Sequence, residues 1–122
     1  ERQFTTRSEV NKDIVIRFEQ LLDEYFDGDT PQQEGLPSVK YFADKVCLSP
    51  NYFGDMIRRQ TGQTASEYIQ NKLVDRAKEA LLSSGKTMSQ IAYDLGFQYP
   101  QHFVRFFKRH VGYTPREYRL QS

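Results

Sequence analysis

The chain contains two copies of one sequence pattern, separated by fifty residues. Aligning Tyr52–Phe53 with His102–Phe103 brings further matching residues together at the same offset. These pairs are Met56–Ile57 with Phe106–Phe107, Arg58–Arg59 with Lys108–Arg109, Gly62 with Gly112, Thr64 with Thr114, Glu67 with Glu117, and Tyr68 with Tyr118. Self-similarity at a fixed offset indicates that one supersecondary unit is used twice.

Upstream of these pairs the offset falls to forty-nine. Phe42–Ala43 then aligns with Ile91–Ala92, and Val46 aligns with Leu95. We therefore expect one additional residue in the turn of the second copy. Each copy reads as a short helix, a tight turn, a second helix, a glycine and a capped helix start, which is the helix-turn-helix pattern.

Apolar residues between the glycine and proline breaks recur every three or four positions, as in helices, and no segment alternates as a strand does. The sequence therefore predicts an all-α fold with seven helices. We expect them at 11–27, 38–46, 50–60, 64–84, 87–95, 100–111 and from residue 114 onward, with a polar loop at 27–37. Ser49 is the expected N-cap of the third helix, with Pro50 at its first position.

The helix starts in the two copies share a capping signature. "TASE" (64–67) and "TPRE" (114–117) each place Thr at the N-cap and Glu three residues later. In such a capping box the two residues satisfy each other's backbone amides. "TMSQ" (87–90) has the same spacing, so we expect a third box there.

The helix at 100–111 separates into two faces when its residues are placed at 100° intervals. Its apolar side holds Phe103, Val104, Phe107 and Val111, and its opposite side holds Gln101, Arg105 and Lys108, flanked by His102 and Arg109. No acidic residue occurs from Gly96 to Arg116. Arg and Gln read guanine and adenine through paired hydrogen bonds, and Lys and Arg bind phosphates. This face therefore favours DNA, whose major groove accepts the second helix of such a motif.

The helix that connects the copies adds a geometric argument. About 20 residues at about 1.5 Å each give a rod of roughly 30 Å, and one turn of B-DNA is about 34 Å. A rod of this length would set two recognition helices in successive major-groove segments.

Charge is distributed unevenly along the chain. The total is 17 Lys and Arg against 16 Asp and Glu, but residues 1–57 carry a net −5 and residues 58–122 a net +6. The basic second half favours an anionic partner, although a chance division of surface charge gives the same numbers.

Several other classes of site find little support. Cys47 is the single cysteine, so no disulfide framework forms, and we expect it to be a small packed residue beside the first turn. His102 and His110 lie about 12 Å apart along one helix, which is too far for a shared metal, and we expect neither a metal nor a cofactor. We find no apolar run of the roughly 20 residues that cross a bilayer and no signal peptide. Because residue 1 is Glu, we expect a piece of a longer protein.

Three segments together resemble the DNA-binding domain of AraC/XylS-family bacterial transcription regulators. They are "ADKVCLSPNYF", "TGQTASEYI" and "IAYDLGFQYPQHFVRFFKRHVGYTPREYR", within a resemblance that covers roughly 36–119. It implies two helix-turn-helix subdomains joined by a long helix, a cytoplasmic protein without catalytic activity, contact with RNA polymerase, and a small-molecule effector bound, if at all, by an upstream domain. The expected layout is an N-terminal helix and loop (1–35), a first helix-turn-helix (36–63), a connecting helix (64–85), and a second helix-turn-helix with a C-terminal helix (86–122).

The resemblance also places base-reading positions on the second helix of each copy. In the first copy they are Asn51, Tyr52, Gly54 and Asp55; in the second they are Pro100, Gln101, His102 and Arg105. Arg58, Arg59, Lys108 and Arg109 complete the expected DNA-binding set. Gly54 and Asp55 depart from the bulky polar or basic groups that better-known members carry, and an acid facing DNA is repelled unless it accepts from cytosine N4.

We therefore expect unequal copies, with direct readout mainly from the second. The first would hold the backbone through Arg58 and Arg59 and read one cytosine through Asp55. The alternatives are a helical protein–protein interaction module with a basic docking face and, less well supported, a fragment of a small enzyme.

Overall fold

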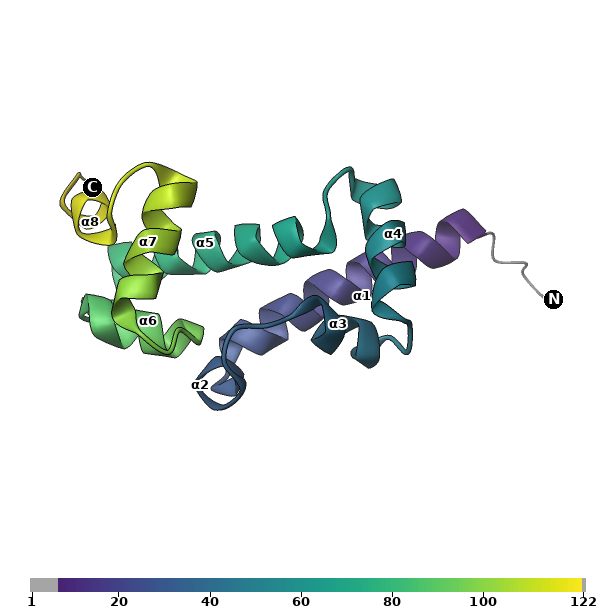
Figure 1. Ribbon diagram of the computed structural model, residues 1–122, viewed down its shortest axis with the longest axis horizontal. Coiled ribbons are helices and arrows are strands. Elements are labelled where there is room, and N and C mark those ends of the chain that lie inside the picture. Colours follow the sequence, from purple (N-terminus) through teal and green to yellow (C-terminus); the bar gives the residue numbers. More distant parts are fainter. Residues whose placement is uncertain (1–6, 122) are drawn as a thin grey trace. The chain divides into compact units, whose positions relative to one another are not determined.

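The computed structural model describes residues 7–121, with side chains from Val10 onward, and all secondary structure within that range is helical. Its helices are α1 (Arg7–Asp27), α2 (Thr30–Glu34), α3 (Val39–Lys45), α4 (Pro50–Thr61), α5 (Ala65–Ser83), α6 (Met88–Leu95), α7 (Pro100–Val111) and α8 (Pro115–Gln121) (Figure 1). The predicted all-α class is confirmed. Within the described range there are eight helices instead of the expected seven.

The additional helix is α2, in a segment expected to be a loop. Pro31 lies in its first turn and is buried, and Gly35 follows its last residue with φ 87°. The Gly35 amide donates to the Pro31 carbonyl at 2.7 Å. Proline just inside a helix start and glycine just beyond its end are helix signals, so the turn residues of this segment were interpreted too simply as a loop.

The chain divides into two compact units, and each contains one copy of the repeated pattern. The first comprises the residues up to Glu24 together with Ser38–Ile69, and it carries α3 and α4. Its core is aromatic: Phe18 of α1 packs edge-on against Phe42 and Phe53, with ring centroids 5.3 and 5.0 Å away. All three rings are fully buried.

The second unit comprises Tyr25–Pro37 and the chain from Gln70 onward, and it carries α6 and α7. Phe103 and Phe107 are fully buried, which confirms their predicted side of the helix. Phe106 is also buried, whereas Val104 and Val111 are half-buried. The apolar side of α7 is therefore centred closer to Phe106 than predicted.

The turns of the two copies show where the additional residue lies. The Leu48 amide donates to Ala43 and the Phe97 amide to Ala92, each at 2.9 Å, so these turns correspond at an offset of forty-nine. Ser49 and Tyr99, the N-caps of α4 and α7, correspond at fifty. The residue between Phe97 and Tyr99 is Gln98, and it is the predicted insertion.

Cys47 does not occupy a packed position. It is exposed, and its φ is 61°, in the left-handed region that residues with a Cβ seldom adopt. The tight turn between α3 and α4 requires this backbone conformation, and the turn points the side chain toward solvent.

Two of the three predicted capping boxes form completely. The Glu67 amide donates to Thr64 Oγ1 at 3.0 Å and the Thr64 amide to Glu67 Oε1 at 2.9 Å. Thr114 and Glu117 make the same pair of bonds at 3.1 and 2.8 Å, and these bonds hold the pKa of Glu117 below its ordinary value. The third box is only half formed. The backbone amide of Gln90 donates to Thr87 Oγ1, but the side chain of Gln90 donates to Asp94 and does not bond back to Thr87.

Candidate nucleic-acid interface

The predicted reading helix of the first unit, α4, buries one side and exposes the other. Its buried side chains are Phe53, Met56 and Ile57. Most residues predicted to bind DNA in this copy are exposed, namely Asn51, Tyr52, Asp55, Arg58 and Arg59, whereas the predicted position Gly54 is half-buried. Ser49 caps the helix by accepting from the Tyr52 amide at 3.1 Å, which fixes the first turn where base-reading residues are expected.

The second unit presents α7 in the same way. Phe103, Phe106 and Phe107 are buried. Most of the predicted DNA-binding residues are exposed, namely Gln101, His102, Arg105, Lys108 and Arg109, whereas the predicted position Pro100 is half-buried. Gly112, with φ 97°, ends α7 by donating its amide to the Lys108 carbonyl at 2.8 Å. We call the exposed sets on α4 and α7 the two outward ridges.

The two outward ridges differ in charge. In α4, Asp55 forms an ion pair with Arg59 one helical turn later, at 3.0 Å. The corresponding residues of α7 are Arg105 and Arg109, and among the described residues neither takes part in an ion pair. The ridge of α7 therefore carries cationic but no acidic side chains, whereas the charge of the α4 ridge is partly neutralised by its own Asp55.

His110 does not belong to the ridge of α7, because its ring contacts the buried residue Phe106. Its Nδ1 is 2.9 Å from the Phe106 carbonyl oxygen, and its ring centroid is 4.3 Å from that of Phe106. His102 instead contacts Tyr99 ring to ring at 5.3 Å, beside the start of α7. The two histidines thus have different surroundings, and only His102 belongs to the exposed ridge.

Each ridge borders a shallow groove that sequence reasoning did not anticipate. Beside α4, Asn51, Asp55 and Arg58 share a groove with Thr64 and Ser66 at the start of α5. From the sequence, Thr64 had been assigned only a capping role. The polar residue Ser66, in the first turn after this cap, was the available sign of a groove here.

In the second unit, His102 shares a groove with Gln98 and Tyr93 and with the backbone around Gly35. The inserted Gln98 thus lies beside the ridge of α7. The part contributed by α2 was not expected, because the proline and glycine of that segment had been interpreted as signs of a loop.

Other kinds of site find no support in the described chain. Among the side chains described from Val10 to Gln121, no three from His, Cys, Asp or Glu gather as a metal would require. Over residues 7–121, none of the helices combines the length and apolarity that a membrane span demands.

Two copies of a short helix, a turn and an outward-facing second helix define a helix-turn-helix protein. A family model for a helix-turn-helix domain matches residues 42–121. The transcriptional activator RhaS of Escherichia fergusonii is 31% identical over 82 residues, which are 67% of this chain and 30% of RhaS. Curated relatives that match more strongly are covered over 34% and 24% of their length, so the chain spans about a third or less of these proteins.

Solved structures share the fold. An AraC-type transcriptional regulator from Chromobacterium violaceum matches with a TM-score of 0.75 at 24% identity, over 90% of this chain and 92% of that one. The DNA-binding domain of AdpA, solved with a target DNA, matches with a TM-score of 0.72 at 21% identity, over 91% and 90%. The chain belongs to the AraC/XylS family of transcription regulators, and it corresponds to their DNA-binding domain.

Proposed function

We propose that this domain binds specific double-stranded DNA sites with α4 and α7 in successive major-groove segments. The observation that carries the proposal is the ridge of α7: exposed Gln, His, Arg and Lys side chains stand on a helix whose opposite side is buried phenylalanine. α7 contains no acidic residue, and among the described residues neither Arg105 nor Arg109 forms an ion pair, so both arginines are available to phosphates and base edges. The AdpA domain, which shares this fold, is a structure solved with DNA.

The length of the connecting helix α5 supports the proposed binding of α4 and α7 one turn of DNA apart. α5 has 19 residues, which correspond to about 28 Å of helix. A turn of B-DNA is about 34 Å, so a rod of this length, with the residues that flank it, suits binding one turn apart.

The copies contribute unequally in this proposal. Arg105 stands where the first copy has Asp55, and Asp55 is paired with Arg59. Direct base reading then falls mainly to Gln101, His102 and Arg105. In the first copy, Arg58 binds the phosphate backbone of the DNA. Asp55 favours a cytosine, because its carboxylate can accept a hydrogen bond from the N4 amino group of that base.

Selection from a random duplex pool, followed by footprinting, tests this function. We expect two protected stretches about one helical turn apart and a steep loss of affinity with salt. Arg105→Ala should lose sequence preference at one position, while Arg17→Ala on α1, a matched exposed arginine that pairs with Glu24, should not. Failure to select any sequence would contradict the proposal and favour docking on an acidic protein instead.

The remaining partners belong to the whole protein. The relatives are named as transcriptional regulators or activators, and this chain spans a minor part of their length. We propose that an upstream domain binds any effector, that contact with RNA polymerase follows DNA binding, and that the protein acts in the bacterial cytoplasm without catalytic activity of its own.

A further inference from the structure

The segment Tyr25–Pro37, which we call the strap, belongs to the second unit although it precedes the first copy in sequence. Asp27 pairs with Arg76 of α5 at 2.8 Å. The Tyr25 hydroxyl donates to the Gly35 carbonyl at 2.6 Å, and Pro31 is fully buried. Asp27 thus ties the strap to α5, the Tyr25–Gly35 bond joins the two ends of the strap to each other, and the middle of the strap is buried at Pro31.

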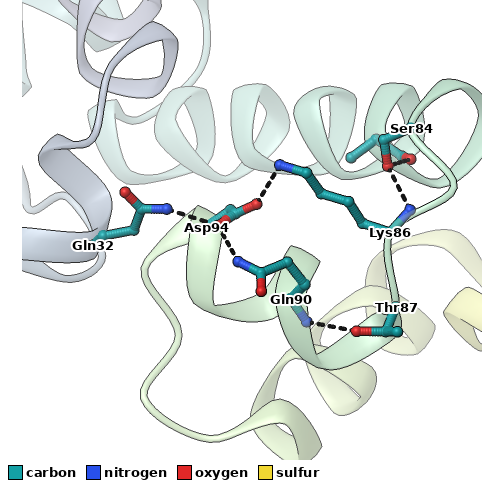
Figure 2. A network of polar contacts seen from close by, with 7 residues as sticks. Gln32, Ser84, Lys86, Thr87, Gln90 and Asp94 are labelled. Carbon is teal, nitrogen blue, oxygen red and sulfur yellow. Dashed lines mark hydrogen bonds and ion pairs between the residues drawn. The ribbon is translucent and has the colours of Figure 1, made fainter.

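Asp94 of α6 is the residue that joins the strap to the helix-turn-helix. Its carboxylate accepts from Gln32 of the strap at 2.7 Å, from Lys86 at 2.8 Å and from Gln90 at 2.8 Å (Figure 2). Desolvation by itself raises the pKa of Asp94, but the three hydrogen bonds and the charge of Lys86 outweigh it and lower that pKa. The ionised carboxylate is therefore the form that the network holds.

The strap also contacts the turn that leads into α7. A Cβ atom added to Gly96 would lie 2.7 Å from the Gly35 carbonyl carbon and 2.9 Å from the Leu36 amide nitrogen. Backbone therefore meets backbone at the residue that ends α6, four residues before α7 begins at Pro100. His102, in the first turn of α7, lines the groove that the strap borders.

The first copy is built differently at the corresponding place. At the offset of forty-nine, Lys45 stands where Asp94 stands in the second copy, and its ammonium lies 5.3 Å from the centre of the Tyr41 ring. The first copy thus presents a cation where the second presents an acceptor. A strap held through Gln32 is specific to the second copy.

We infer that Gln32 and Asp94 are positioning residues for DNA reading by α7. They hold the strap against α6, the strap supports the turn at Gly96, and that turn sets the direction in which α7 leaves α6. The inference rests on the proposed DNA binding, and it adds a segment outside the residues matched by the family model, which begin at residue 42.

The test compares Gln32→Ala with Gln33→Ala on the same helix. Gln33 donates to Asp29 within the strap at 3.2 Å, so its loss leaves the contact with α6 intact. Affinity is measured, well below the unfolding temperature of each variant, on the selected duplex and on two versions in which one protected stretch or the other is scrambled.

Gln32→Ala should weaken binding about three- to tenfold, the range expected for the net loss of one hydrogen bond. The loss should appear on the selected duplex and on the version that keeps only the stretch bound by α7. Binding to the version that keeps only the other stretch should be unchanged, as should all binding by Gln33→Ala.

Equal losses for both variants, or a Gln32→Ala loss that is the same on every duplex, would overturn the positioning role. Asp94→Asn provides a second variant, which keeps an acceptor oxygen for Gln32 but removes the charge that Lys86 pairs with; we expect a smaller loss with the same dependence on the duplex. If the unaltered domain selects no DNA at all, the proposed function itself has failed, which is a different result.

Discussion

Cys47 and Gly96 occupy the same place in the two copies, with φ values of 61° and 106°. Each follows the short helix of its copy, and each precedes a residue whose amide donates to a buried alanine, Ala43 or Ala92. The second copy uses the residue type that adopts this conformation freely. The first copy uses a residue with a Cβ, for which the left-handed region is costly.

Cys47→Gly should therefore stabilise the domain. Removing the Cβ relieves about 1–2 kcal/mol of backbone strain, and the greater freedom of glycine in the unfolded chain takes back about 0.4–1 kcal/mol. We expect a net gain of about 0.5–1 kcal/mol in the free energy of unfolding, measured by urea denaturation. Cys47→Ala is the control, because it keeps the Cβ; a gain of the same size in that variant would refute the explanation.

Gly96→Ala should destabilise the domain more than Gly62→Ala. Both glycines have positive φ, 106° and 81°, so both substitutions carry the backbone strain of about 1–2 kcal/mol. Only at Gly96 would the new Cβ meet backbone atoms of Gly35 and Leu36, at 2.7–2.9 Å, whereas nothing lies within 4 Å at Gly62. Thermal unfolding of the two variants measures the difference, and equal losses would show that the strap yields at no cost.

Phe103→Ala should cost about 3–5 kcal/mol in the free energy of unfolding, because Phe103 is fully buried and its loss leaves a cavity. Val104→Ala, the next residue on α7, is the control: its side chain is only half-buried and smaller, so we expect a clearly smaller loss. Chemical denaturation of both variants decides the matter. A small effect at Phe103 would mean that the buried side of α7 is misassigned.

Asp55→Asn should make DNA binding more dependent on salt. In the unaltered domain Arg59 is paired with Asp55 at 3.0 Å, so its charge is partly used within the helix. With that pair removed, Arg59 can neutralise one more phosphate, which steepens the slope of log affinity against log salt by about 0.9.

The matched control for this experiment is Asp44→Asn. Asp44 pairs with Lys40 at 2.8 Å, and both residues belong to α3, which carries neither outward ridge, so the loss of Asp44 changes the net charge equally without freeing a ridge arginine. An identical slope change in the two variants would trace the effect to net charge alone.

The phenol of Tyr68 should lose its proton at an unusually high pH. Burial, followed by its hydrogen bond to Glu19 and the charge of that carboxylate, raises the pKa of Tyr68 to about 12. Because the folded-state pKa lies above the ordinary value of 10.0, the protonated phenol stabilises the fold fully below pH 10, and this contribution is lost as the pH rises toward 12.

Ultraviolet titration of the unaltered domain against Tyr68→Phe isolates this group. Glu19→Gln should move the phenol back toward its ordinary pKa, because the charge is removed while the side-chain size is kept. A late phenol that is insensitive to Glu19→Gln would show that burial alone sets its pKa.

Repetition made much of this fold predictable from the sequence. The same offset marked the ends of α4 and α7 and the two capping boxes, and all of these form as expected. The exposed and buried sides of α7 followed from its period, since Phe103 and Phe107 recur at a helical spacing. These signals act within one or two helical turns, where few alternative structures compete with the predicted one.

The contacts of the strap were missed because their partners lie far away in the chain. α2 is five residues long, too short to be stable by itself, and it is held by Gln32 reaching Asp94 across 62 positions. The incomplete cap at Thr87 has a local cause instead, since the Gln90 side chain donates to Asp94 one helical turn later. The roles of the ridge residues also exceed what one sequence can give, because they depend on a duplex whose sequence is unknown.

The complete Thr–Glu boxes at residues 64–67 and 114–117 anchor the chain immediately after each reading helix, using side chains that take no part in the ridges. The ridge residues of one helix could therefore be exchanged, for instance by placing Gln and Arg at positions 51 and 55 as at positions 101 and 105, while the capping box that follows the helix is left unchanged. Duplication of the unit, followed by independent substitution of the ridge residues in each copy, is a route by which one fold comes to recognise many different DNA sites.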